Sequence, residues 1–273
     1  MFAHDFVRNA YLAGTFIALA CGITGWFVVL RGQLFAGDAL THVAFVGAIA
    51  AAVLGFDERV GLFALTVLVA GGMAVLGRRG QADDAVIGTV FAWILGIGVF
   101  LLAVLAMSAS GGTGVSAANT LFGSIYSLTP GGSRLAAAVG LAVAIVVLLA
   151  VRPLLLTSLD AELASLRGIP APSLAVAFLL LLAIVTAQST QAVGALLLLG
   201  LLAAPAGAAH RLTARPYRGL ALSALIAVVA MWGGLALSYA IASLPPSSAI
   251  IGLAGAGYAA ASVLERLRSR RPV

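Results

Sequence analysis

The chain contains no lysine, and all 15 of its basic residues are arginine. This absence rules out a phosphate-binding loop of the G-x-x-x-x-G-K-[ST] kind, in which the lysine reaches the nucleotide phosphates. It also rules out a Schiff-base lysine. If ATP drives this protein, the nucleotide therefore binds to another chain.

Cysteine and charge are also scarce. Cys21 is the only cysteine, which excludes an internal disulfide and a cysteine-rich metal site. Charged residues make up 9% of the chain and hydrophobic residues 62%, and the mean hydropathy is +1.15. Apolar runs of the length that crosses a bilayer recur along the sequence. We therefore predict an all-α polytopic membrane protein.

The apolar runs predict about nine membrane-spanning helices in a single bundle. Residues 1–273 are expected to form one transmembrane domain without a soluble domain. The first run is too long for a cleaved signal and is interpreted as a retained helix. The predicted helices lie near residues 10–30, 39–55, 60–77, 84–107, 133–151, 172–187, 191–209, 219–242 and 248–264.

The arginines predict the orientation of the bundle. The net charge of +6 is spread in small groups between apolar runs and forms no basic stripe, so nucleic-acid binding is not expected. Only Arg8, Arg59 and Arg134 fall in one set of alternate connections. The other set holds Arg31, Arg78, Arg79, Arg152, Arg167, Arg211, Arg215, Arg218, Arg266, Arg268, Arg270 and Arg271. The positive-inside rule then places the amino terminus outside and the carboxyl terminus in the cytoplasm of a plasma-membrane protein.

The stretch "GDALTH" at 37–42 carries the first candidate site. Asp38 and His42 are four residues apart, so on a helix they lie on one face. A carboxylate and an imidazole suit zinc or manganese, and a weak two-ligand site suits an ion that must also leave. In a structural interpretation, Asp38 instead caps a helix beginning at Ala39 and His42 hydrogen-bonds within the bundle. The residues alone leave both interpretations open.

A second candidate is the polar connection at 152–172. Thr157 and Asp160 fit a capping box, Gly168 suits a left-handed helix stop, and Pro170 prevents continuation. We therefore predict a short amphipathic helix near 158–168, which either lies on the membrane or docks a cytosolic partner. The charged residues of this helix are Asp160, Glu162 and Arg167, and its exposed apolar ridge consists of Leu163 and Leu166.

Other polar residues receive structural interpretations first. Asp83 and Asp84 open the fourth predicted helix and are expected to cap it. His210, beside an arginine, is expected to be interfacial rather than a ligand. Gln188 and Gln191 are polar positions that either line a path or satisfy a helix end.

Several of these motifs together resemble the permease subunits of the zinc and manganese ABC transporters. The first and last motifs are the more specific, and Thr41 and "VAFVG" after His42 depart from the family's usual Ser and Pro. The motifs are "GDALTHVAFVGAIAA" at 37–51, "DDAVIGTVFAWILGIGVFLLAV" at 83–104, "ANTLFGSIYSLTP" at 118–130, "DAELASLRGI" at 160–169 and "QAVGALLLLGLLAAPAGAAHRLT" at 191–213.

The resemblance implies a permease that forms a homodimer in the lipid membrane and works by alternating access. It implies cytoplasmic ATPase subunits, which use the ATP, and an extracytoplasmic metal-binding protein. The segment Asp160 to Gly168 then resembles the coupling helix, and Asp38 with His42 would lie on the metal path or at an inner gate. Zinc is the first expected cargo and manganese the second, and no permanently bound cofactor is expected.

Three other classes remain as alternatives. A secondary, ion-coupled transporter would use Asp38, Asp83 or Asp84 as proton sites, but such sites belong near mid-membrane and most charges here fall at helix ends. A membrane enzyme lacks support, because no nucleophile and base arrangement and no H-E-x-x-H motif occurs in the sequence. A purely structural membrane subunit is compatible with the composition.

Overall fold

The computed structural model describes residues 4–76, 84–108, 123, 125–195, 198–241 and 243–269, and it contains no β-strand within these ranges. The helices, in chain order, are α1 (Asp5–Leu30), α2 (Leu34–Leu54), α3 (Glu58–Leu76), α4 (Asp84–Ser108), the short 3-10 helix η2 (Ile125–Ser127), α6 (Pro130–Leu149), α7 (Val151–Leu159), α8 (Ala161–Leu166), α9 (Ala171–Val193), α10 (Leu198–Leu212), α11 (Pro216–Ala240) and α12 (Pro246–Ser269).

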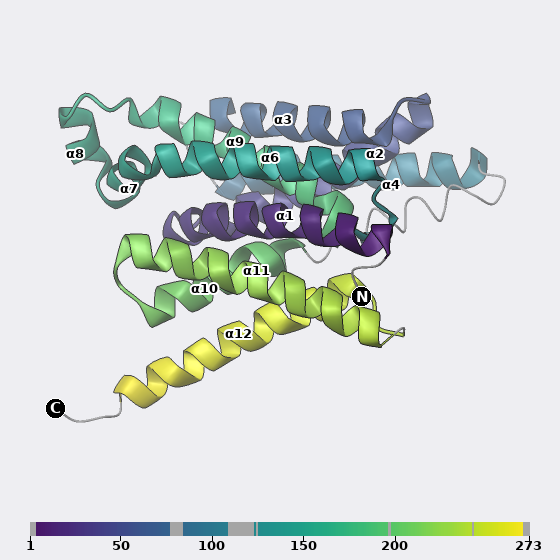
Figure 1. The fold of residues 1–273 in the computed structure, drawn as a ribbon. Coiled ribbons are helices and arrows are strands. Elements are labelled where there is room, and N and C mark those ends of the chain that lie inside the picture. The colour runs from purple at the N-terminus through teal and green to yellow at the C-terminus, as the bar shows by residue number, and fades with distance from the viewer. Residues whose placement is uncertain are drawn as a thin grey trace.

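The helices run up and down through one bundle. Among the described residues, 8 helices are long and apolar enough to cross a membrane. α10 has 15 residues and packs against α1, α11 and α12. α1 begins at the opposite end of the bundle from the end of α12 (Figure 1). The predicted all-α polytopic membrane fold is confirmed, with α10 as the short ninth segment.

Several predicted helix ends are displaced by a few residues, and two of these shifts occur at glycines with positive φ. Gly32 has a φ of 66°, which allows the chain to reverse directly after α1, so that α2 begins at Leu34 rather than at residue 39. The predicted helix at 191–209 is divided at Gly194, whose φ is 93°. Its first residues, 191–193, therefore extend α9, and α10 begins at Leu198.

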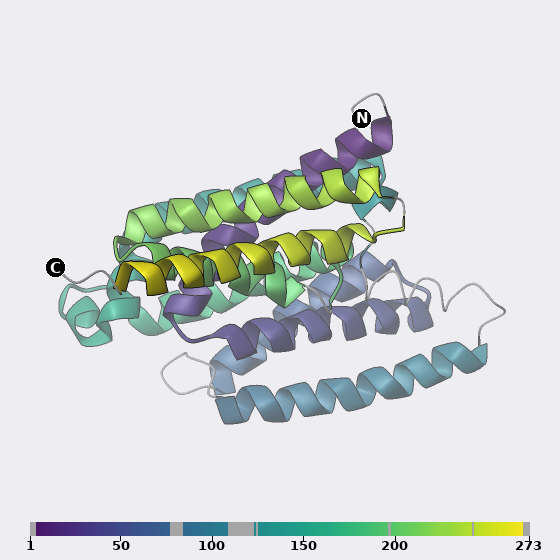
Figure 2. The same cartoon turned by 90° about the horizontal axis from the view of Figure 1, so that it is seen from below.

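The core forms around α1 and α9. α1 packs against α6, α10 and α11, while α9 packs against α2 and α3. α4 is the least enclosed of the spanning helices and lies at one edge of the bundle (Figure 2). The short helices α7 and α8 lie at the end of the bundle where α1 and α12 finish (Figure 1), which we call the α8 end.

Candidate functional site

Asp38 and His42 lie in the first half of α2 and face each other. Nε2 of His42 is 3.9 Å from Oδ1 of Asp38. Two bonds from a transition-metal ion to such ligands span about 4.2 Å in a straight line, so small side-chain rotations would let one ion contact both atoms. The side chains are 21% and 32% exposed for His42 and Asp38, respectively. The sequence prediction that the two residues share a helix face is confirmed.

Asp38 does not cap its helix. The N-cap of α2 is Gln33, and Asp38 is the fifth residue of the helix. The capping interpretation is therefore wrong, because the helix begins one turn earlier than its polar residue suggests. The hydroxyl of Thr41 donates to the backbone oxygen of Asp38 at 2.7 Å and not to its carboxylate.

The pair has apolar neighbours on α4. The His42 ring centroid is 5.4 Å from that of Phe91, which also packs edge-on against Phe35. No group of three or more His, Cys, Asp or Glu side chains gathers anywhere in the described part of the chain. Asp84 is the exposed first residue of α4, while Asp83 lies outside the described residues. The pair is thus an open two-ligand arrangement and not a closed structural metal centre.

The predicted short helix is α8, but its cap differs in part from the prediction. Oδ1 of Asp160 accepts a hydrogen bond from the backbone N–H of Leu163 at 2.9 Å, so Asp160 alone is the N-cap. Thr157 belongs to α7, where its hydroxyl donates to the Pro153 carbonyl. The capping box is therefore wrong, whereas the predicted glycine stop is confirmed by the φ of 75° at Gly168.

The apolar ridge of α8 is exposed at the α8 end of the bundle. Leu163 is 40% exposed and Leu166 84% exposed, whereas Ala164 between them is fully buried. Glu162 is also exposed and lies beside the ridge. Leu159, the last residue of α7, is a further exposed leucine that the sequence pattern does not indicate.

Arg31 is the residue that sequence reasoning missed most clearly. The sequence marks it only as one of the arginines that set the orientation. In the structure it is partly buried and donates hydrogen bonds to Ser158 and Thr157 on α7. The sequence offers no local signal for this, since 126 positions separate Arg31 from Thr157.

The other polar candidates have contacts of their own. Nε2 of His210 is 3.1 Å from the Trp26 carbonyl oxygen, and its ring stacks on Trp26 at 4.9 Å between centroids. His210 therefore joins α10 to α1, in line with its structural interpretation. Gln188 is 4% exposed, and its Oε1 has no hydrogen-bond partner in the described chain. Gln191 lies one turn further along the same helix.

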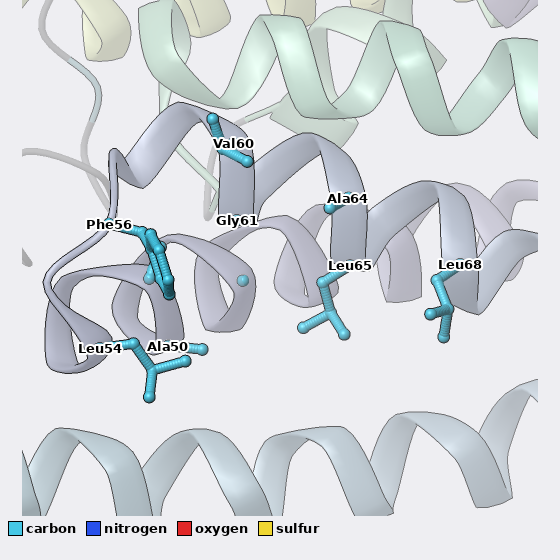
Figure 3. A pocket seen from close by; sticks show the side chains of 10 residues that line it. Ala50, Leu54, Phe56, Val60, Gly61, Ala64, Leu65 and Leu68 are labelled. Carbon is cyan, nitrogen blue, oxygen red and sulfur yellow. The ribbon is translucent and has the colours of Figure 1, made fainter.

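A pocket of about 280 Å³ lies along α2 and α3 near their shared connection. Its lining is apolar and includes Leu54, Phe56, Leu65 and Leu68. Figure 3 shows the side chains of Leu54, Leu65 and Leu68 directed toward the gap between these helices and α4. With no polar side chain in its lining, this pocket does not suit a metal ion.

A sequence profile of the ABC 3 transport family matches residues 3–264. This chain belongs to the ABC 3 transport family. It is a multi-pass membrane protein and a component of a transporter rather than an enzyme in itself. The resemblance to permease subunits of metal ABC transporters, drawn from the motifs, is thereby confirmed.

Relatives of this family cover most of the chain. A manganese transport system membrane protein, MntC, of Halalkalibacterium halodurans is 28% identical over 89% of this chain and 82% of its own length. The manganese protein MntD of Bacillus subtilis is 30% identical over 85% of each chain. Among solved structures, a chain of PsaBC from Streptococcus pneumoniae, in complex with a Fab, has a TM-score of 0.80 at 25% identity. The match covers 95% of this chain and 92% of that one.

Proposed function

We propose that this chain is the membrane permease of an ATP-driven importer that moves a divalent transition-metal ion into the cytoplasm. The observation that carries the proposal is the Asp38 and His42 pair on one face of a spanning helix. Oδ1 of Asp38 and Nε2 of His42 are 3.9 Å apart. Two ligands bind an ion weakly enough to release it again, which a transport path requires and a structural site does not.

Manganese is the preferred cargo and zinc the second. A carboxylate and an imidazole accept both metals, so the sequence alone ranks them only by resemblance. Two relatives that match most of this chain are named for manganese transport. These names support reversing the order expected from the sequence.

The α8 end is proposed to face the cytoplasm and to dock the ATPase subunits. The described arginines at this end include Arg152, Arg167, Arg215, Arg218 and Arg266, whereas Arg8, Arg59 and Arg134 lie at the other end. This bias follows the positive-inside rule. α8 is the proposed coupling helix, in which Asp160 caps the first turn, Gly168 ends it, and Glu162, Leu163 and Leu166 face the partner.

The complete transporter would contain a second copy of the permease and an extracytoplasmic metal-binding protein at the end opposite α8. Alternating access of the bundle would then expose the Asp38 and His42 pair to each side in turn. An ion-coupled secondary transporter is less favoured, because membership of an ABC family points to ATP as the energy source. Apart from Asp38, the acidic residues of the described spanning segments lie in their first turns or near the end of α12.

The direct test is metal uptake into proteoliposomes that contain the permease, its ATPase and its binding protein. Radioactive manganese should accumulate only with hydrolysable ATP. Accumulation that ignores ATP and follows an imposed proton gradient would replace this proposal with the secondary-transporter class. In this assay Asp38→Asn tests the role of the pair. Asp5→Asn is its matched control, because Asp5 is an exposed carboxylate at the opposite end of the bundle.

A further inference from the structure

Arg31 joins the start of α2 to both helices that flank α8. It is the C-cap of α1, and only Gly32 and Gln33 separate it from α2. Its Nε donates to the hydroxyl of Ser158 at 2.8 Å and its Nη2 to the hydroxyl of Thr157 at 3.0 Å. Both hydroxyls belong to the last turn of α7, immediately before Asp160 caps α8.

The second flanking helix contacts the same guanidinium. Its Cζ lies 4.7 Å from the ring centroid of Phe178, a fully buried residue of α9. A planar guanidinium suits this double role, since it donates in its plane and stacks on an aromatic face. Burial lowers the pKa of Arg31 to about 10, so the side chain is still charged at neutral pH.

The two hydroxyls are themselves held firmly to α7. The Thr157 hydroxyl donates to the Pro153 carbonyl at 3.0 Å, and the Ser158 hydroxyl donates to the Leu154 carbonyl at 2.5 Å. Each hydroxyl thus uses its one proton within α7 and accepts from Arg31 with a lone pair. Arg31 is therefore bonded to a fixed point on α7, and a shift of that turn carries the α1–α2 connection with it.

From these contacts we propose that Arg31 is a positioning residue that transmits movement of α8 to the Asp38 and His42 pair on α2. The inference rests on the proposed function, since it concerns how the ATPases act on the metal path. A displaced α8 moves the end of α7, to which Arg31 is hydrogen-bonded. It also moves α9, where Arg31 stacks on Phe178 two turns from the start of the helix. The three-residue turn then passes the shift to α2, where Asp38 is the fifth residue. Energetic coupling between α8 and the pair on α2 then passes through a continuous series of contacting side chains.

The test is the number of manganese ions imported per ATP hydrolysed by the complete assembly in proteoliposomes. Arg31→Met should lower this ratio about tenfold, the change in an equilibrium that one charged hydrogen bond typically produces. ATPase binding and the ATPase rate should stay near those of the unaltered protein, a combination that separates lost coupling from lost docking. Arg31→Lys, which keeps the charge but cannot bridge two hydroxyls while stacking, should restore part of the ratio.

A second variant keeps the test decisive if Arg31→Met fails to fold. Thr157→Val with Ser158→Ala leaves Arg31 in place and removes its acceptors. It should lower the ratio similarly, and combining it with Arg31→Met should add little, because both changes break one link. Arg152→Met, which alters an exposed arginine on the same α7, is the matched control and should have no effect.

The outcomes separate this inference from the proposed function. An unaltered assembly that imports no manganese with ATP contradicts the proposed function, whatever Arg31 does. ATP-driven import with an unchanged ratio in the Thr157→Val, Ser158→Ala variant overturns the role of Arg31 alone. An equal loss in the Arg152→Met control also overturns it, because the effect would then belong to α7 charge in general.

Discussion

Gly47 of α2 and Gly61 of α3 are in backbone contact, so that a methyl group on either one would meet the carbonyl oxygen of the other. Gly61→Ala should therefore force the two helices apart and destabilise the protein by about 1–3 kcal/mol. Thermal unfolding in detergent measures this loss. Gly71→Ala, on the same helix where a methyl group meets open space, is the control and should not destabilise. Equal stability of the two variants would contradict the close contact.

Removing either ligand of the pair should weaken manganese binding. Because even outer-shell changes at metal sites cost about 10–100-fold in affinity, Asp38→Asn and His42→Ala should each lose at least tenfold. The measurement is equilibrium binding of radioactive manganese to the purified permease complex. Asp5→Asn should bind manganese like the unaltered protein. Full affinity in both Asp38→Asn and His42→Ala would reduce the pair to packing residues.

The exposed ridge of α8 should be needed for ATPase association. Leu163→Ala with Leu166→Ala removes apolar surface that is 40% and 84% exposed, respectively, so the fold of the bundle should be unaffected. Co-purification of the ATPase with the permease checks the prediction. Leu135→Ala changes a leucine that is 51% exposed at the other end of the bundle and provides the matched comparison. Undiminished association of the doubly substituted protein would remove α8 as the docking helix.

Asp160 should stabilise α8 through its single cap. Loss of such a side-chain cap costs about 1 kcal/mol, which corresponds to several-fold faster local opening. Amide hydrogen exchange at Leu163, whose N–H the Asp160 carboxylate accepts, should therefore speed up in Asp160→Ala. Thr157→Ala changes the other residue of the predicted capping box and should leave exchange at Leu163 nearly unchanged. Faster exchange at Leu163 in Thr157→Ala but not in Asp160→Ala would contradict Asp160 as the cap.

The sequence predicted the fold class because membrane helices obey a simple local rule. A run of about 20 apolar residues is read directly from the chain, and the eight long spans follow from it. Helix ends are harder to predict, because Gly32 and Gly37 both precede apolar residues and only the structure shows that the chain turns at Gly32. The fixed spacing of Asp38 and His42 was enough to place them on one face, whether or not the boundary was right.

Contacts between distant segments could not be predicted from the sequence. Arg31 reads as one of many arginines at helix ends, and nothing near it indicates Ser158 or Phe178 as partners. Leu159 is likewise an exposed last residue of α7, because the helix ends before Asp160. Such features depend on packing of several helices at once, which no local pattern encodes.

The most direct test of the central claim is manganese uptake by the complete assembly as a function of ATP hydrolysis, measured in parallel for the unaltered protein and for Asp38→Asn. We predict ATP-dependent accumulation by the unaltered protein, and loss of that accumulation in Asp38→Asn while the ATPase is still bound. Accumulation that is equal in both proteins, or that proceeds without ATP, would contradict the account.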